Sequence, residues 1–340
     1  MKSSFFVSIC IPSYNRPDGL KRALESVDAR KYADEIQIVV CEDCAPKRPE
    51  VANVVKTFQT VTQYNVKYIE NEVNYGHGKN WRQCAHQAEG EYLIYMGDDD
   101  MFTPNMLDQF IEWLHNHDNL GYVLRSYQIL NQDGSIEDHR YYNEDRFYEP
   151  GIEAYLAFFW KSNLMSGYTI KRELTYNFED DSVDYTLFYQ MYLMAEICLR
   201  YKSGFCTIPI AQYIGDGVSY FGVNEKEKDF YKPGVNAATE LSNINKFFVV
   251  TELVDRKNSV NSTVALKNEF AKYSSFPTMA KFRTYGLKEL FYCRKTLIKM
   301  GLNKSLYFSI YFLALAFLGT SICMSIINTI KRIHGGRPEL

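Results

Sequence analysis

Short apolar runs alternate with amphipathic stretches through the first 125 residues. The apolar runs are rich in β-branched and aromatic residues and have the length of single strands, whereas the stretches between them repeat apolar residues at helical spacing. Strands are predicted at residues 5–11, 35–41, 66–70, 91–96 and 121–125. Helices are predicted at residues 16–27, 49–58, 79–88 and 104–115. This alternation predicts an α/β fold with a mostly parallel sheet flanked by helices.

The pattern changes after residue 125. Mixed strand and helix patterns follow, with an aromatic amphipathic helix predicted at 148–162 and a long helix at 184–201. We expect residues 1–125 and 126–235 to be two halves of one domain. Residues 236–304 are expected to form a helical region that is partly amphipathic and basic.

Residues 305–330 are a run of 26 positions without a charged side chain. About 20 apolar residues suffice to cross a bilayer as a helix. Basic residues flank the run on both sides, so its orientation stays open, and a single span, a re-entrant element and a helix lying in the membrane interface all fit. A buried core helix is the alternative without a membrane. The preceding basic stretch around Lys288, Arg294, Lys295 and Lys299 suits either anionic lipid or the exposed face of a soluble domain.

The composition fits a folded chain of one large or two smaller domains. Of the 340 residues, 46% are hydrophobic, which is enough for a substantial core. The net charge of −3 gives no support for a nucleic-acid partner. Eight cysteines are spread over the whole length, and the first residues lack the pattern of a signal peptide. We therefore expect free thiols in a reducing, cytoplasmic compartment.

Three polar segments directly follow three of the predicted strands. They are Pro12–Asn15 after the first strand, Glu42–Asp43 after the second and Asp98–Asp100 after the fourth. In an open α/β sheet, ligands bind at the carboxyl ends of the parallel strands. The three segments are therefore expected at one crevice, although two of them are acidic.

The acidic triplet, Asp98, Asp99 and Asp100, needs a counter-charge, because neighbouring carboxylates repel one another and lose solvation beside an apolar strand. A hard divalent cation, Mn²⁺ or Mg²⁺, takes oxygen ligands and completes its shell with water and substrate phosphates. A calcium loop that starts at Asp98 is excluded, because Thr103 and Gln109 stand where it needs Gly and Glu. Capping of the following helix would explain one carboxylate but not three.

Four motifs in the first 125 residues resemble family 2 glycosyltransferases of the GT-A fold. In chain order they are VSICIPSYNRP from Val7, IQIVVCED from Ile36, NYG from Asn74, and AEGEYLI from Ala88 followed by the acidic triplet and Pro104. Their order and spacing match together, although no single motif is decisive. The Gly-Asp-Asp-Asp variant is similar to enzymes that add sugars to bacterial surface polysaccharides such as O-antigens. The resemblance implies a nucleotide-sugar donor and a glycan acceptor.

The resemblance also implies which residues bind the nucleotide. Pro12 and Tyr14 would contact the base and the ribose, and Asp43 would hydrogen-bond the base. Asp98 stands where the family contacts the ribose or the metal. Lys79, which follows His77 in a glycine-flexed loop beside the predicted crevice, or Arg82 is a candidate for the diphosphate, although a solvated loop fits equally well.

For the metal, the resemblance implies Asp99 as the main ligand, with Asp100 following it. The chain departs from the family's usual Asp-X-Asp-Asp pattern, because Gly97 replaces the first Asp, and Glu42 also stands in place of an Asp. The choice of two metal-binding carboxylates among the three therefore stays open.

Glycosyl transfer also needs a base that deprotonates the acceptor hydroxyl. Residues 179–185 offer several carboxylates just before the predicted long helix. In the family an acidic residue at this helix start serves as base, so the resemblance implies Asp184, with Asp181 in reserve. The match is partial, because the family's Glu-Asp pair is Val183-Asp184 here. Capping of the helix N-terminus is the alternative role.

Cys41 and Cys44 have the CxxC spacing of redox and zinc sites. A redox pair usually opens a helix, whereas Cys41 ends an apolar strand and two acids lie between the thiols. No nearby second pair completes four zinc ligands. Both functions are therefore disfavoured.

These observations predict a metal-dependent inverting glycosyltransferase at the cytoplasmic face of a membrane, attached through its C-terminal segment. It would transfer a sugar to a growing, lipid-linked glycan, with the acceptor and the base in residues 126–235. A nucleotidyltransferase would share the layout and the metal, but Pro12–Asn15 lacks the Gly-rich basic loop expected of it. A non-catalytic glycan-binding or assembly protein on the same scaffold is the other alternative.

Overall fold

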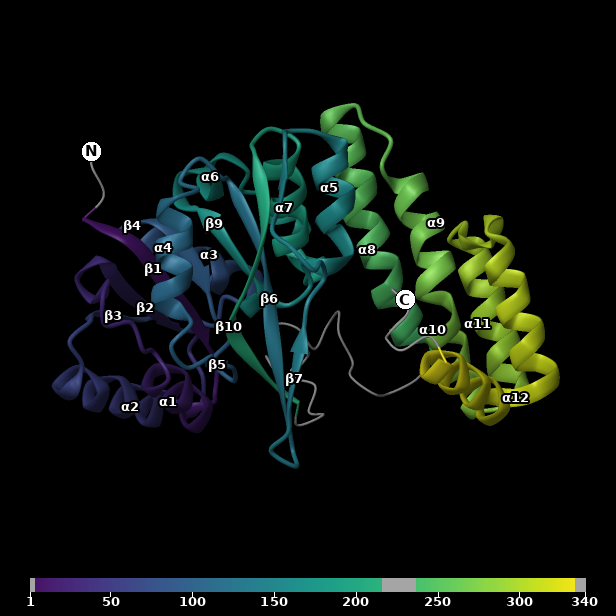
Figure 1. The fold of residues 1–340 in the computed structure, drawn as a ribbon, viewed down its shortest axis with the longest axis horizontal. Helices are drawn as coiled ribbons and strands as arrows, with labels where there is room; N and C mark the ends of the chain where they lie inside the picture. Colours follow the sequence, from purple (N-terminus) through teal and green to yellow (C-terminus); the bar gives the residue numbers. More distant parts are fainter. Residues whose placement is uncertain (1–3, 216–236, 334–340) are drawn as a thin grey trace. The chain divides into compact units, whose positions relative to one another are not determined.

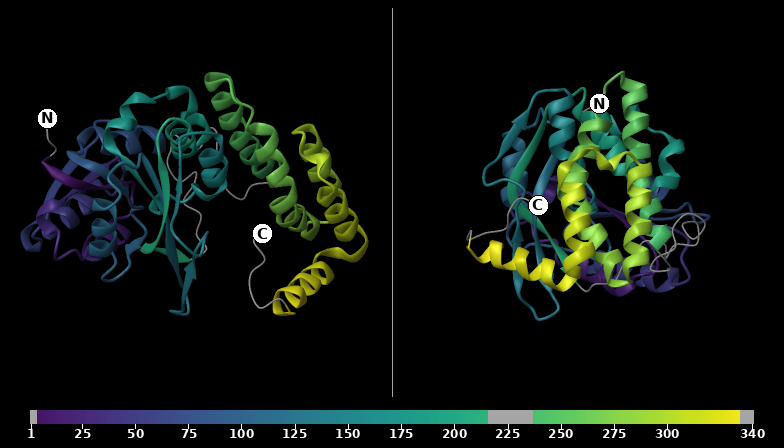
Figure 2. Two further views of the ribbon diagram at one scale, coloured as in Figure 1. Left: turned by 45° about the horizontal axis from the view of Figure 1, so that its top comes forward. Right: turned by 90° about the vertical axis from the view of Figure 1, so that its right-hand side faces the viewer.

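The computed structural model describes residues 4–215 and 237–333 of the chain. The chain divides into two compact units, Met1–Tyr231 and Lys232–Leu340. Figures 1 and 2 show a sheet with helices packed against it in the first unit, and helices alone in the described part of the second.

One mixed sheet organises the first unit, and within the described residues it has ten strands. Eight of them follow the order β3-β2-β1-β4-β9-β6-β10-β5, while β7 pairs with β6 and β8 pairs with β10. In chain order the strands are β1 (Phe5–Ser13), β2 (Ile36–Glu42), β3 (Asn65–Glu70), β4 (Gly90–Tyr95), β5 (Met101–Phe102), β6 (Tyr122–Asn131), β7 (Ile136–His139), β8 (Arg146–Tyr148), β9 (Tyr168–Lys171) and β10 (Ser203–Gly215). The predicted α/β class is confirmed.

The helices of this unit connect and cover the strands. In chain order they are α1 (Pro17–Glu25), the 3-10 helix η1 (Ala33–Glu35), α2 (Arg48–Val61), α3 (His77–Gln87), α4 (Leu107–His115), α5 (Ile152–Phe158), the 3-10 helices η2 (Phe159–Lys161) and η3 (Met165–Gly167), α6 (Arg172–Asn177), the 3-10 helix η4 (Asp181–Thr186) and α7 (Tyr189–Cys198). Together α5 and η2 occupy most of the helix predicted at 148–162.

The half of the sheet built from β3, β2, β1 and β4 is parallel throughout. Val7, Ile9 and Ile11 of β1 belong to the core that also contains residues of α1, α2 and α4. On the other face, Cys10 interacts with Cys84 of α3. Because helices cover both faces, β1 reads in the sequence as an almost continuous apolar run.

The other half of the sheet is mixed, and several of its strands are not predicted from the sequence. β9 lies antiparallel between β4 and β6, and β10 runs parallel to β6. Pro209 in the middle of β10 lacks a backbone donor, so the sequence reads as a break in the strand. The register of β10 on β6 shifts between Cys206 and Ala211. Pro209 therefore lies in a bulge, where the ladder does not need its hydrogen bond.

The long helix predicted at 184–201 begins later in the structure. Residues 181–186 form the 3-10 helix η4, Leu187 has a left-handed backbone with φ of 64°, and α7 starts at Tyr189. A left-handed residue cannot continue a right-handed helix. Asp184 therefore lies in η4 instead of opening α7, and the predicted helix start is wrong.

The described part of the second unit is helical, as the pattern after residue 236 predicts. Its helices are α8 (Ala237–Asn258), α9 (Thr263–Tyr273), α10 (Ser275–Thr284), α11 (Leu287–Lys299), the 3-10 helix η6 (Leu302–Lys304) and α12 (Leu306–Ile333). They bury a shared set of apolar side chains that includes Leu241, Phe248, Leu266, Met279, Phe282, Leu290, Leu297 and Phe308.

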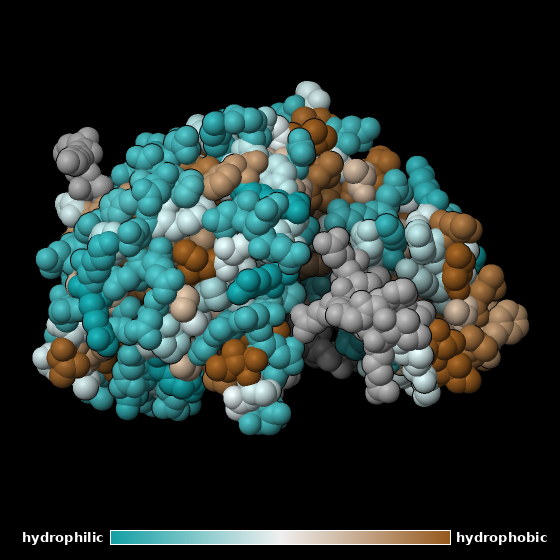
Figure 3. All heavy atoms as spheres, in the orientation of Figure 1, coloured by the Kyte–Doolittle hydropathy of each residue, from teal (hydrophilic) through white to brown (hydrophobic). Residues whose placement is uncertain are grey.

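α12 contains the uncharged run and is broken at Gly319, whose φ of 76° is non-helical. Figure 2 shows its two limbs meeting at an angle. By length and composition, Leu306–Thr329 is apolar enough to cross a membrane, with a mean hydropathy of 2.2. Because 11% of its most apolar stretch is buried, the pattern of a soluble core helix is disfavoured. Figure 3 shows hydrophobic residues gathered on the surface over α11 and α12.

Candidate active site

The carboxyl ends of β1, β2 and β4 lie side by side at one edge of the sheet. Ser13 pairs with Glu42 across β1 and β2, and Cys10 pairs with Tyr95 across β1 and β4. The ladder continues one step further, because the N–H of Asp43 donates to the carbonyl of Ser13 at 3.1 Å. The loop after β1 and the acidic segments after β2 and β4 are thus neighbours, as predicted from the order of the strands.

Asp98 joins the loop after β1 to the acidic triplet. Its Oδ2 accepts a hydrogen bond from the backbone N–H of Tyr14 at 3.0 Å, and its Oδ1 receives the guanidinium of Arg16 at 2.6 Å. Burial raises the pKa of Asp98 to about 6, although the charge of Arg16 acts in the opposite direction. Arg16 also lies 3.2 Å from Oδ2 of Asp99. The guanidinium of Arg16 therefore forms ion pairs with both Asp98 and Asp99.

Asp100 is held by residues that lie far away in the sequence. Its Oδ2 accepts a hydrogen bond from the hydroxyl of Ser166, and its Oδ1 accepts one from the N–H of Ile214 at 3.3 Å. The same hydroxyl oxygen of Ser166 accepts from the N–H of Gly97 at 2.9 Å. Burial and then the charge of Asp99 raise the pKa of Asp100 to about 7. The chain therefore holds Asp100 in place without supplying it with a cation at these contacts.

Asp99 is the most exposed carboxylate of the triplet, with 25% of its side chain exposed. A Cβ at Gly97 would lie 2.7 Å from Oδ1 of Asp99 and 3.2 Å from Oδ2 of Asp100. Glycine at position 97 thus leaves room for the carboxylates of Asp99 and Asp100 to converge. This is a steric reason for glycine in place of the family's usual Asp. Convergent oxygens with excess negative charge fit a hard divalent cation.

A cation at this place would need further ligands. In residues 4–215 and 237–333, no group of three or more His, Cys, Asp or Glu side chains is arranged to hold a metal ion. Mg²⁺ in phosphate-transferring sites commonly takes one or two carboxylates and completes its shell with water and phosphate oxygens. The triplet suits that open kind of site better than a closed protein cage.

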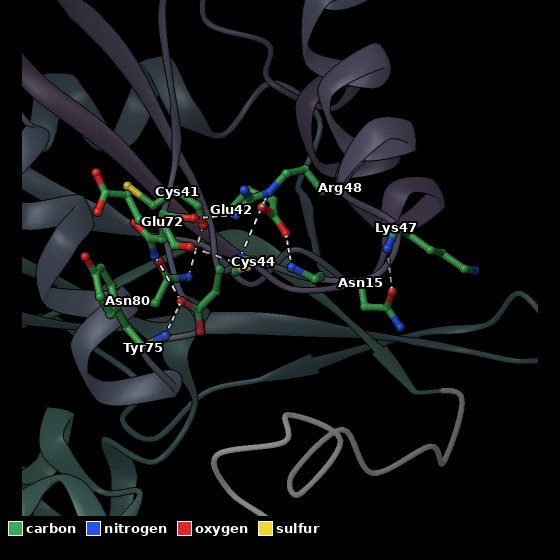
Figure 4. Close-up of polar contacts among 12 residues, drawn as sticks. Asn15, Cys41, Glu42, Cys44, Lys47, Arg48, Glu72, Tyr75 and Asn80 are labelled. Atoms are coloured by element: carbon green, nitrogen blue, oxygen red, sulfur yellow. Dashed lines mark hydrogen bonds and ion pairs between the residues drawn. The ribbon is translucent and has the colours of Figure 1, made fainter.

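Asp43 is 1% exposed, and its carboxylate binds the loop that precedes α3. Its Oδ1 accepts the N–H of Tyr75 at 2.8 Å and the side-chain amide of Asn71 at 3.0 Å. Its Oδ2 accepts the N–H of Gly76 at 2.8 Å. Figure 4 shows Tyr75 and Asn80 beside the end of β2. Asp43 therefore positions the start of α3, and its contact with a nucleotide base stays a prediction.

Glu42 anchors the loop after β2. Its buried carboxylate accepts the N–H groups of Cys44 at 3.1 Å and Ala45 at 2.6 Å, and it pairs with Arg48, as Figure 4 shows. The glutamate in place of the family's usual aspartate thus has a structural role. Cys44 in this loop and Cys41 at the end of β2 both carry free thiols.

Asp181 and Asp184 form a second acidic group, which lies against α3. Arg82 of α3 donates to both oxygens of Asp184, at 2.7 and 2.9 Å, and to Asp181 at 2.7 Å. Arg82 is 5% exposed, and its guanidinium lies 4.7 Å from the ring centre of Tyr189. Lys79 adds a second cation 3.3 Å from Asp181. Two carboxylates here face two cations.

Asp184 is held more firmly than Asp181. Its side chain is 22% exposed, against 72% for Asp181. A Cβ at Gly78 would lie 2.7 Å from Oδ1 of Asp184, so this carboxylate packs directly on the first turn of α3, where the helix N-terminus favours negative charge. The geometry therefore favours Asp184 as the carboxylate with a fixed orientation. Its role as a base stays a prediction.

His77, the first residue of α3, interacts electrostatically with Arg16, Asp43 and Asp184. Burial and the charge of Arg16 lower its pKa to about 4, while Asp43 and Asp184 act in the opposite direction. These interactions place His77 within electrostatic reach of all three residues. With this pKa the imidazole is neutral near pH 7 and adds no positive charge to the site.

The whole of this edge falls within one family match. The sequence profile of Glycosyl transferase family 2 matches residues 8–193, which is more than half of the chain. The chain belongs to glycosyl transferase family 2. Both acidic groups, Arg16 and Arg82 lie inside the matched range.

Curated relatives of this family 2 glycosyltransferase match over shorter segments. An "uncharacterized glycosyltransferase" of Haemophilus influenzae is 25% identical over 117 residues, which are 34% of this chain and 37% of the relative. The abequosyltransferase RfbV of Salmonella typhimurium is 26% identical over 102 residues, or 30% of either chain. The UDP-Glc:alpha-D-GlcNAc-diphosphoundecaprenol beta-1,3-glucosyltransferase WfgD of Escherichia coli is 23% identical over 132 residues, or 39% of this chain and 49% of the relative. Each match thus spans less than half of the relative.

Solved structures establish the fold. Residues 1–349 of TarS from S. aureus, in complex with UDP-GlcNAc, give a TM-score of 0.52 at 14% identity, over 87% of this chain and 89% of that one. The complex of the same protein with UDP gives a TM-score of 0.50 at 16% identity. At this identity the likeness shows the fold alone, and it confirms the predicted GT-A fold.

The structure places the predicted nucleotide-binding residues of this glycosyltransferase around the same strand ends. Pro12 and Tyr14 are half-buried at the end of β1 and in the loop after it. Lys79 is directed toward Asp181, and 49% of its side chain is exposed. Their contacts with a donor stay predictions.

Several residues that complete the site have contacts that the sequence does not predict. Arg16 is part of the first motif, but its pairing with the triplet has no local signal. Ser166 and Ile214 lie 66 and 114 positions from Asp100. Arg82 is considered from the sequence only as a partner of the diphosphate, whereas in the structure it binds Asp181 and Asp184.

Proposed function

We propose that this family 2 glycosyltransferase moves a sugar from a nucleotide-sugar donor to a hydroxyl group of a growing, lipid-linked surface polysaccharide. The reaction would be metal-dependent and would invert the anomeric carbon. The observation that carries the proposal is the presence of two different acidic groups: among the residues that the structure describes, the triplet is short of positive charge, while Asp181 and Asp184 pair with two cations. Stabilisation of a leaving diphosphate and deprotonation of an acceptor hydroxyl are the two requirements of such a transfer.

Asp99 and Asp100 are the residues that would hold Mn²⁺ or Mg²⁺. Their oxygens converge above Gly97, and Asp98 is engaged by Tyr14 and Arg16. A bound cation would stabilise the negative charge that develops on the diphosphate as the sugar leaves.

The donor is proposed to be a sugar linked to a nucleoside diphosphate. The bound UDP-GlcNAc of TarS, which shares the fold, supports this class of donor. Pro12, Tyr14 and Asp43 would lie at the base and ribose, because they surround the ends of β1 and β2. Lys79, whose side chain is about half exposed, would meet the diphosphate.

Asp184 would act as the base. As the bond between the anomeric carbon and the diphosphate oxygen breaks, the acceptor oxygen would form a new bond on the opposite face, and Asp184 would take its proton. The nucleoside diphosphate leaves with the electron pair of the broken bond. Because the acceptor attacks from the opposite face, the configuration of the anomeric carbon inverts. Arg82 binds both carboxylate oxygens of Asp184 and so fixes the orientation of the carboxylate. A fixed orientation makes proton transfer from the acceptor more efficient. Asp181 is the reserve candidate.

The acceptor and the location are proposed from two independent observations. The name of WfgD describes a GlcNAc acceptor on diphosphoundecaprenol, and RfbV is named an abequosyltransferase. The exposed apolar helix α12 is suited to a membrane. A lipid-linked acceptor would place this enzyme at the cytoplasmic face of a membrane, where we expect its free thiols to be stable.

The proposal is tested by incubating the purified chain with a set of nucleotide sugars, with and without Mn²⁺, and identifying the released product. A glycosyltransferase releases nucleoside diphosphate, and we expect Mn²⁺ to be required. Release of pyrophosphate from a nucleoside triphosphate and a sugar phosphate would indicate a nucleotidyltransferase instead. Binding of glycans without turnover of any donor would indicate a non-catalytic protein.

A further inference from the structure

The first limb of α12, residues 306–318, is apolar on two opposite faces. Its inner face is buried in the second unit through Phe308, Phe312 and Leu315. Its outer stripe consists of four exposed apolar residues at spacings of four, three and four. They are Leu306 (74% exposed), Ile310 (48%), Leu313 (51%) and Phe317 (84%). The outer face of a helix in a soluble protein is normally polar. The outer stripe therefore indicates an apolar environment outside the second unit.

The inner face is fixed to the protein by polar contacts. Arg283 donates to the carbonyl of Leu315 at 3.0 Å, and the guanidinium of Arg294 lies 4.7 Å from the ring centre of Phe312. The hydroxyl of Tyr311 donates to the carbonyl of Lys272 at 2.9 Å. Guanidinium groups are expensive to place in hydrocarbon. A limb that packs on such groups cannot be surrounded by lipid on all sides.

The limb is also too short to span a bilayer. Residues 306–318 form about 20 Å of helix at 1.5 Å per residue, whereas the hydrocarbon core measures about 30 Å. The left-handed backbone of Gly319 then turns the chain. The sequence run is long enough for a span, but the helix that it forms is not.

The segment before the limb carries positive charge. Between residues 287 and 304 there are five basic side chains and one acidic side chain, Glu289. Four of the basic side chains are exposed: Lys288, Lys295, Lys299 and Lys304. α11 also exposes Phe291 and Tyr292. Apolar and aromatic groups next to lysines are typical of helices that bind an anionic lipid surface.

We propose that α11 and the first limb of α12 lie in the plane of an anionic membrane surface. The outer stripe enters the boundary of the acyl chains, and the lysines of α11 contact lipid phosphates. This docking rests on the membrane attachment proposed above and is independent of glycosyl transfer. It selects the interfacial arrangement from the three that the sequence leaves open.

The test is flotation of the purified full-length protein with vesicles of phosphatidylcholine, with or without phosphatidylglycerol. We expect binding to require phosphatidylglycerol and to weaken with salt. The triple variant Ile310→Gln, Leu313→Gln and Phe317→Gln is expected to lower the partition coefficient at least about tenfold. A matched control replaces exposed apolar residues of the first unit, Val61→Gln, Ile136→Gln and Ile152→Gln, and should bind as the original protein does.

Neutralising the lysines separates the two contributions. Lys288→Gln, Lys295→Gln and Lys299→Gln together should remove the preference for phosphatidylglycerol. Thermal midpoints and nucleoside diphosphate release are expected to stay unchanged in all these variants, which separates loss of docking from loss of folding or of catalysis.

Three outcomes would overturn the docking mode. Protein that resists extraction from membranes by alkaline carbonate would be a true span. Protein that ignores vesicles but forms a dimer in light scattering, which the outer-stripe variant converts to a monomer, would use the stripe to bind a second copy. Equal flotation of the outer-stripe variant and its control would show that the stripe does not contact lipid.

Discussion

The two acidic groups of the first unit differ in how the chain neutralises them. Asp181 and Asp184 face Arg82 and Lys79, so two negative charges meet two positive ones. The acidic triplet contains three carboxylates, and within the part of the chain that the structure describes its ion pairs come from Arg16. The pKa values of Asp98 and Asp100 are correspondingly raised. Among the described residues, the group at Asp181 and Asp184 is matched by two cations, whereas the triplet pairs with Arg16 and keeps an excess of negative charge that a bound cation would offset.

The comparison is tested most strongly at Asp99. Asp99→Asn keeps the size of the side chain but removes the charge that we expect to bind the metal, so turnover should fall about a thousandfold. Nucleoside diphosphate release at saturating Mn²⁺ measures this loss. The thermal midpoint without metal should stay level or rise, because repulsion within the triplet decreases.

The exposed Asp118 supplies the matched control for this substitution. Asp118→Asn should change neither turnover nor the stabilisation by Mn²⁺. If Asp99→Asn kept the full Mn²⁺-induced shift of the thermal midpoint, the metal would have to bind elsewhere.

The next largest effect is expected at Asp184. Asp184→Asn should lower kcat about a hundredfold by removing the base, with the KM for the donor and the Mn²⁺-induced thermal shift unchanged. Asp181→Asn should cost less than about threefold, because this carboxylate is largely exposed. Equal losses from the two variants in steady-state kinetics would contradict the distinction between them.

Arg82 tests how the second group is held together. Arg82→Lys keeps the positive charge but loses the fork that binds both oxygens of Asp184. The free energy of unfolding should fall by about 1–2 kcal/mol, measured by urea denaturation, and kcat should fall more than KM changes. Lys79→Gln is the control for the unfolding measurement alone, because its exposed ion pair should contribute less than about 1 kcal/mol.

The smallest effect is expected from pH. In the folded protein the pKa values of Asp98, about 6, and Asp100, about 7, lie above those of the unfolded chain. The folded state then binds more protons, so the free energy of unfolding of the metal-free protein should fall as pH rises from about 4 to about 7. Urea denaturation at several pH values measures this slope. Asp100→Asn should flatten it, and an unchanged slope would contradict the raised pKa.

The sequence predicts the parallel half of the sheet well, because its strands and helices alternate and each element has one clear periodicity. It fails at β10, where Pro209 conceals a strand that continues through a bulge. It also fails at the start of α7, because no residue type announces the left-handed backbone of Leu187. In both places, tertiary pairing outweighs the local preference of the residues.

The candidate site likewise has a part that the sequence predicts and a part that it does not. The order of the strands predicts that Tyr14, Asp43 and the acidic triplet lie together, because strand ends in a parallel sheet are neighbours. The contacts of Asp100 with Ser166 and Ile214 cannot be read from the sequence, because they depend on the mixed half of the sheet. The sequence pattern therefore predicts which carboxylates form the site, but not the residues that hydrogen-bond to them.

The bulge at Pro209 sets the phase of the last part of β10. Pairing with β6 resumes at Ala211, and three residues later the N–H of Ile214 reaches Asp100. Successive residues of a strand point in opposite directions, so a loss from positions 207–210 that shifted the register by one residue would turn the N–H of Ile214 away from Asp100. The bulge therefore acts as a spacer, and its length decides whether Asp100, 114 positions earlier, keeps its hydrogen bond to the N–H of Ile214.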